Sequence, residues 1–183
     1  MKPQSTALQP RRRLASACRP IAFVAVLATA TGCGVSNLDF QVDRRLSFQA
    51  PAEDAEVELP LTIRWDVDDF TITEPGAEAG KKSGYFAVFV DAAPQPPGKP
   101  LSWLARDDRA CETTPGCPDD KWFNSHDVYR VSGTSLTLER LPFVRAKGDT
   151  EEHTITIVLV DPQGHRIGES AFTRTVKVAR GRR

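Results

Sequence analysis

Residues 61–67, which read Leu-Thr-Ile-Arg-Trp-Asp-Val, decide the fold because apolar and polar side chains alternate through the whole stretch. In an extended strand, this period of two places Leu61, Ile63, Trp65 and Val67 on one face. The polar side chains then point to the opposite face. One buried face and one solvated face are typical of a strand in an antiparallel sheet.

Other segments of the chain show strand patterns as well. Residues 136–138 alternate, residues 153–159 place one histidine and three aliphatic side chains on a common face, and residues 172–179 form a last strand. Residues 85–90 are apolar at every position, which predicts a strand that is buried on both faces.

Turn signals separate these segments, as in residues 132–134 (SGT) and 161–164 (DPQG). After Cys33 no segment has a sustained helical period, and prolines recur too often for long helices. We therefore predict an all-β protein in which residues 45–179 form an antiparallel β-sandwich of about seven strands.

Three motifs resemble the fibronectin type III family of immunoglobulin-like sandwiches. Residues 60–65 (PLTIRW) resemble its second strand with the core tryptophan, and residues 135–142 (SLTLERLP) resemble its fifth strand. Residues 152–178 resemble its last hairpin, with His153 at the place where that family often has a tyrosine. The resemblance implies binding or spacing more often than catalysis, although a fold alone does not fix a function.

The strand pattern breaks in residues 92–127, which we interpret as an insertion closed by a disulfide. Its first part holds four prolines, which favour an extended backbone. Long loops of this kind are commonly functional. We take Trp103, Trp122 and Phe123 as candidate binding residues. Two interpretations stay open: these rings pack over the outer face of residues 85–89, or some stay exposed and form a binding platform.

Cys111 and Cys117 are an even pair in a chain that we expect to be exported, which predicts a disulfide between them. The alternative is two free thiols. Closing so short a ring should contribute roughly 2 kcal/mol by the loop-entropy relation. That is enough to stiffen a loop but not to hold a fold together.

The N-terminal residues predict export and lipid anchoring. Residues 1–32 carry five basic side chains and no acidic one, and an apolar run leads to Gly32 and Cys33. This resembles a bacterial lipoprotein signal, which implies that Cys33 is lipidated and anchors the chain outside the cytoplasm. Alternatives are a signal peptide cleaved elsewhere and an uncleaved membrane anchor. In the lipoprotein interpretation, residues 33–44 are a tether between the lipid and the sandwich. Residues 180–183 are a basic tail.

Charge argues against nucleic acid as a partner. Removing residues 1–32 leaves 19 basic against 24 acidic side chains, so the remaining chain has a net charge near −5. A polyanion would be repelled by such a protein.

The sequence offers little support for catalysis, a cofactor or a metal. The histidines at 126, 153 and 165 lack the spacing of a helical zinc motif, and the chain has no nucleophile elbow and no phosphate-binding loop. Carboxylates cluster at residues 66–69, 107–108 and 119–120, but they do not form a calcium loop. We expect no enzyme activity, no cofactor and no metal site.

These observations predict a non-catalytic, lipid-anchored envelope protein that binds another envelope component through residues 92–127. A structural subunit of an envelope assembly and a glycan-binding module are the alternatives. Two coplanar, exposed Trp rings would favour a glycan ligand. A tight cluster of histidine and carboxylates in a cleft would favour an enzyme.

Overall fold

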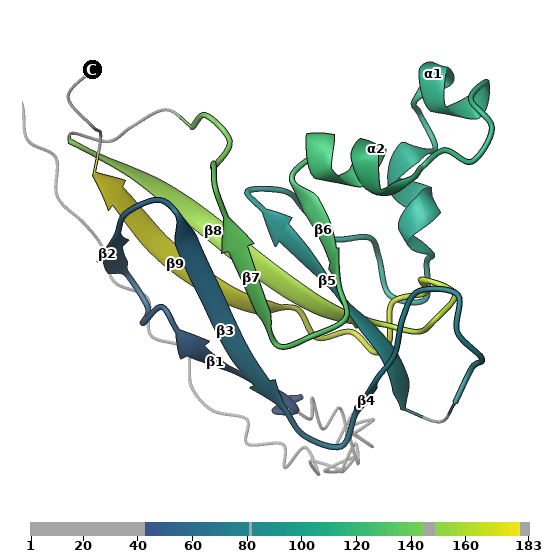
Figure 1. The fold of residues 1–183 in the computed structure, drawn as a ribbon, viewed down its shortest axis with the longest axis horizontal. Helices are drawn as coiled ribbons and strands as arrows, with labels where there is room; N and C mark the ends of the chain where they lie inside the picture. Colours follow the sequence, from purple (N-terminus) through teal and green to yellow (C-terminus); the bar gives the residue numbers. More distant parts are fainter. Residues whose placement is uncertain (1–42, 81, 145–148, 180–183) are drawn as a thin grey trace, which may run out of the picture. The chain divides into compact units, whose positions relative to one another are not determined.

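A computed structural model describes residues 43–80, 82–144 and 149–179 (Figure 1). Residues 1–32, Cys33, the tether up to residue 42 and the tail at residues 180–183 lie outside the described residues. The strands are β1 (Leu46–Ala50), β2 (Ala55–Val57), β3 (Leu61–Val67), β4 (Thr71–Ile72), β5 (Ser83–Val90), β6 (Val128–Val131), β7 (Ser135–Leu138), β8 (Thr150–Val160) and β9 (Phe172–Ala179).

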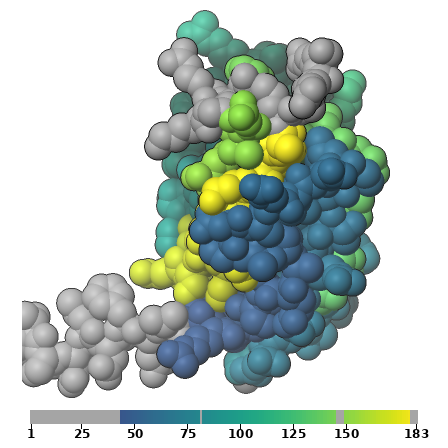
Figure 2. Space-filling model, turned by 90° about the vertical axis from the view of Figure 1, so that its left-hand side faces the viewer, coloured from purple at the N-terminus to yellow at the C-terminus, as the bar shows by residue number. Residues whose placement is uncertain are grey.

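The strands form two sheets that pack face to face, which confirms the predicted all-β sandwich. One sheet has the order β1-β3-β7; the other has the order β2-β9-β8-β5-β4, and β6 also pairs with β5. All pairs are antiparallel except two short ones, β2 with β9 and β4 with β5. Figure 2 shows the segment that contains β1 to β3, in blue, lying against β9, in yellow.

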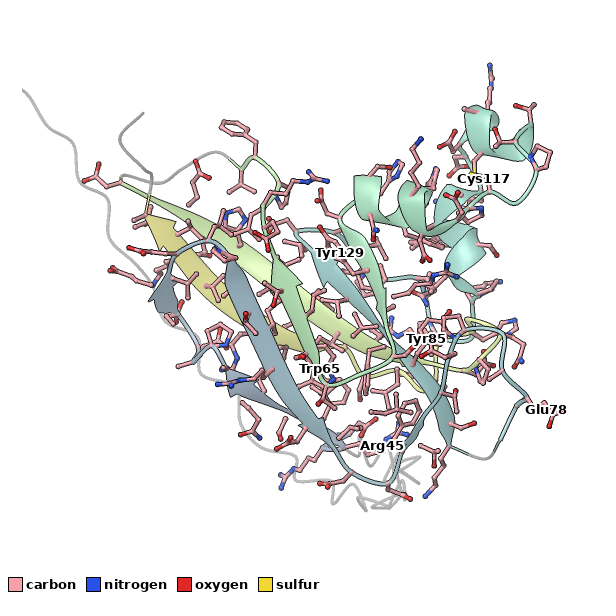
Figure 3. All side chains as sticks on the ribbon, viewed as in Figure 1. Arg45, Trp65, Glu78, Tyr85, Cys117 and Tyr129 are labelled. Carbon is pink, nitrogen blue, oxygen red and sulfur yellow. A yellow bond between two sulfur atoms is a disulfide. The ribbon has the colours of Figure 1, made fainter. Side chains whose placement is uncertain are left out.

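The core between the sheets follows the alternation of β3. Leu61, Ile63 and Trp65 are at most 4% exposed, whereas the polar residues between them face solvent. The Trp65 ring meets Phe86 of β5 edge to face, with ring centroids 5.3 Å apart. Figure 3 shows Trp65 between the two sheets, where sandwich cores form.

Strand β5 is buried at every position, as predicted, because it has a core on each side. Phe86, Val88 and Val90 face the other sheet. Tyr85, Ala87 and Phe89 face outward and, with Val158 and Val160 of β8, belong to a second apolar cluster. The insertion supplies the cover of this second cluster through Leu101 and Phe123. The molecule therefore has a third layer over the outer face of the larger sheet.

Short helices within the insertion are one part of the fold that the sequence pattern did not predict. They are a 3-10 helix, η1 (Leu101–Ala105), and two α-helices, α1 (Arg109–Glu112) and α2 (Asp120–Ser125). Each is too short to show the apolar period of a longer helix. No helix in the described ranges has the length and apolar character needed to span a bilayer.

Residues 161–164 form the predicted turn, with the Gly164 amide donating to the Asp161 carbonyl oxygen over 2.8 Å. Gly164 has φ of 86°, which suits a glycine. The hairpin is nevertheless not tight, because β9 begins only at residue 172. Residues 165 and 166 instead form bridges to Pro100 and Val160, so the Pro-rich segment is tied to this connection.

Candidate functional site

The insertion is held on the larger sheet by helix α2. Phe123 is 2% exposed and lies in the second apolar cluster. Arg130 of β6 donates to the Asp120 carboxylate over 2.6 Å, and its guanidinium lies 5.3 Å from the centroid of the Phe123 ring. Apolar burial and an ion pair thus fix α2 at both its start and its middle.

The predicted disulfide is present and closes the outer part of the insertion. Cys111 and Cys117 are bonded, and their Cα atoms are 5.2 Å apart. Figure 3 places Cys117 beside α1, in the part of the insertion that projects from the sheets. Cys111 is 6% exposed, whereas residues 112–116 of the ring face solvent.

Two aspartates connect this ring to Trp122. The Trp122 indole N–H donates to Oδ2 of Asp108 over 2.7 Å, and the Trp122 backbone N–H donates to Oδ1 of Asp119 over 2.8 Å. Each aspartate is also the N-cap of a helix: Asp108 caps α1 and Asp119 caps α2. The His126 ring stacks on the indole, with centroids 3.9 Å apart.

These hydrogen bonds keep one carboxylate ionised. The indole N–H of Trp122, helped by the backbone N–H groups of Cys111 and Ala110, lowers the pKa of Asp108 below its usual value. The negative charge of Asp108 is therefore held in a fixed position next to an aromatic ring.

An open cavity of about 350 Å³ lies among these groups. Its walls include Asp108, Asp119, Trp122, Lys121 and the disulfide. The cavity combines apolar groups with charged side chains, which is the usual composition of a binding site.

The three candidate binding residues have different environments. Phe123 belongs to the core of the insertion, and Trp122 is half-buried beside the cavity. Trp103 is half-buried, and the Arg106 guanidinium lies 3.5 Å from the centroid of its ring. Both tryptophans therefore have a ring face covered by a side chain of their own chain.

Comparison with protein-family models, with curated proteins and with solved structures finds no match. We therefore argue the function from the geometry of the described residues.

A metal centre has no support in the described part of the chain, where no three His, Cys, Asp or Glu side chains are grouped to hold an ion. Four of the carboxylates weighed for calcium have other partners. Asp69 forms an ion pair with Lys82, Asp120 pairs with Arg130, and Asp108 and Asp119 cap helices.

The tightest contact between a histidine and a carboxylate joins a buried histidine to an aspartate at the surface. Nδ1 of His153 lies 2.7 Å from Oδ2 of Asp91, and the His153 side chain is 1% exposed. Asp91 also accepts the backbone N–H of Thr154 over 2.7 Å. This pair ties the end of β5 to β8.

The sequence reading missed Asp108, Asp119 and Lys121 as parts of one site. A signal for the two aspartates was present, because each precedes a short run that an aspartate can cap. Their convergence on Trp122 could not be predicted, because it depends on how the disulfide ring and α2 pack against each other.

Acid should loosen this site. Because the folded pKa of Asp108 is lowered, its contribution to stability is complete above the unfolded pKa and is lost as the pH falls through the folded value. We expect the protection factors of the Ala110 and Cys111 amides, which are corrected for the intrinsic pH dependence of exchange, to fall as the pH drops below about 4. Hydrogen exchange followed by NMR measures them. In Asp108→Asn, which still caps the helix, the fall should be much smaller; an equal fall would contradict the assignment.

Proposed function

We propose that this chain is a non-catalytic, lipid-anchored cell-envelope protein that binds another envelope protein through the insertion at residues 92–127. In this proposal Cys33 carries the lipid, the sandwich is the scaffold, and the projecting part of the insertion makes the contact. The order of strands in the two sheets supports the resemblance to immunoglobulin-like binding and spacing domains.

The observation that carries the proposal is that the insertion is fixed to the sandwich at one side and has a cavity of its own in its outer part. Its inner side is fixed by Phe123 and the pair Arg130–Asp120, and its outer part is closed by the disulfide. Covering the outer face of β5 requires only the inner side of the insertion, which packs on the second apolar cluster. Trp122 packs in part against the second apolar cluster, but Asp108 and the disulfide ring do not belong to that cluster, so this outer part is free to serve recognition.

A protein ligand is better supported than a glycan. Sugar stacking needs broad, accessible ring faces, but Trp103 lies under Arg106 and Trp122 under His126. The remaining alternative is a structural subunit that makes its contacts through the sandwich edges rather than the insertion.

Crosslinking and pull-down from native envelopes test the proposal. Deleting the insertion is unsuitable, because Leu101 and Phe123 cover the second apolar cluster. Exchanging the charges of Arg109 and Glu112, which are exposed on α1, changes the surface and keeps the net charge. We expect Arg109→Glu with Glu112→Lys to lose the crosslinked partner.

The matched control exchanges charges on the outer face of the smaller sheet. Arg64 and Asp66 are exposed on β3, so Arg64→Glu with Asp66→Lys is an equivalent exchange far from the insertion in sequence. This variant should retain the partner. Retention by both variants would exclude the insertion as the contact and favour the structural-subunit alternative.

A further inference from the structure

The cavity of the insertion has the features of a receptor for one charged side chain. Its volume of about 350 Å³ lies at the small end of ligand sites. It is large enough to hold one long side chain.

The charged residues that line the cavity determine whether a positively or a negatively charged side chain is favoured. Asp108 and Asp119 both line it, and Lys121 is the opposing cation. Residues 92–127 as a whole carry six acidic and four basic side chains. The local field therefore favours a cation.

The two carboxylates are also held in place before any ligand arrives. Oδ1 of Asp108 accepts the backbone N–H groups of Ala110 and Cys111 at 2.9 and 3.1 Å, while its Oδ2 accepts the Trp122 indole N–H. Asp119 accepts the backbone N–H of Trp122. Carboxylates that are already oriented lose little conformational freedom on binding.

The His126 ring covers one face of the Trp122 indole, so a second attraction for the same ligand comes from the part of the indole that borders the cavity. The polar edge of the indole is already bonded to Asp108. An electron-rich ring beside two carboxylates is a favourable environment for a guanidinium or ammonium group.

We propose that this cavity binds an arginine or lysine side chain of the partner protein, between Asp108, Asp119 and the Trp122 ring. This inference rests on the proposed function, because it names the chemistry by which the insertion recognises its partner. Lys121 weakens the attraction and so favours ligands that place their charge on the side of the aspartates.

NMR titration of the full chain tests the inference with defined probes. N-acetyl-arginine amide should shift the Trp122 indole N–H signal, assigned with Trp122→Phe, with millimolar affinity. N-acetyl-citrulline amide, which has nearly the same shape without the charge, should not. Equal shifts with both probes, or none with the arginine probe, would overturn the inference. A shift with N-acetylglucosamine alone would do so as well.

Two variants with one charge removed test whether the arginine probe binds in this cavity. Asp119→Asn keeps the helix cap and removes one charge, so the arginine probe should bind roughly tenfold more weakly. Lys121→Gln should bind it more tightly, because the opposing charge is gone. Unchanged affinity in both variants would exclude the cavity as the site.

The same variants separate this inference from the proposed function. If the exchange at Arg109 and Glu112 abolishes partner capture but Asp119→Asn leaves it intact, the insertion is the contact and the cationic side chain is not its ligand. If partner capture survives the exchange while the arginine probe still binds, the proposed function fails on its own.

Discussion

Gly84→Ala is expected to destabilise the sandwich by at least about 3 kcal/mol, because overpacking and backbone strain act at the same position. A Cβ at residue 84 would lie 1.8 Å from the Val160 carbonyl oxygen, which is backbone of β8 and cannot rotate away. Residue 84 also has φ of 157°, which L side chains rarely adopt. Urea denaturation followed by circular dichroism measures the loss.

Alanine substitutions at two other glycines distinguish the effect of the steric clash from the effect of backbone strain. Gly76 has φ of 81° but open space around it, so Gly76→Ala should cost about 1 kcal/mol from strain alone. Gly133 has open space and no unusual φ, so Gly133→Ala should change stability by less than about 0.5 kcal/mol. If Gly84→Ala unfolded at the same urea concentration as Gly133→Ala, the close approach of β5 to β8 would be refuted.

Trp65→Ala is expected to cost about 3–5 kcal/mol, the range for removing a large aromatic side chain from a core. Trp65 is 1% exposed and packs edge to face on Phe86. It fills the space between the sheets at the centre of β3, where the backbone cannot collapse into the cavity. A fall of the urea midpoint, with a nearly unchanged slope, should report this loss.

Trp65→Phe is the matched variant. The indole Nε1 of Trp65 is buried and has no hydrogen-bond partner among the described residues, so replacing it with a smaller apolar ring breaks no hydrogen bond. The cost should be clearly smaller than that of Trp65→Ala. Equal losses in the two variants would mean that the polar edge of Trp65, not the volume of its ring, stabilises the core.

The scaffold could be predicted well, because its signals are local. Alternation in residues 61–67 placed Leu61, Ile63 and Trp65 in the core, and the apolar run at 85–90 indicated a strand buried on both faces. The short strands β2 and β4 gave no such signal, because two or three residues are too few to show a period.

The candidate site could be predicted only in part. The disulfide followed from counting cysteines, and it is present. The sequence could not show which of the two aromatic rings is buried, because Trp122 and Phe123 are neighbours of similar hydrophobicity. Helix α2 turns Phe123 toward Val128 and Val158 and leaves Trp122 at the cavity.

The sequence by itself determined the patterns of β3, β5, β8 and β9 and the disulfide pair, because each depends on neighbouring residues or on residue type alone. Only the tertiary structure decided that Asp108 and Asp119 meet at Trp122. It also decided that His153 is tied to Asp91, 62 positions away in the chain. Such contacts between distant residues depend on how separately formed elements pack, and no local pattern in the sequence encodes that packing.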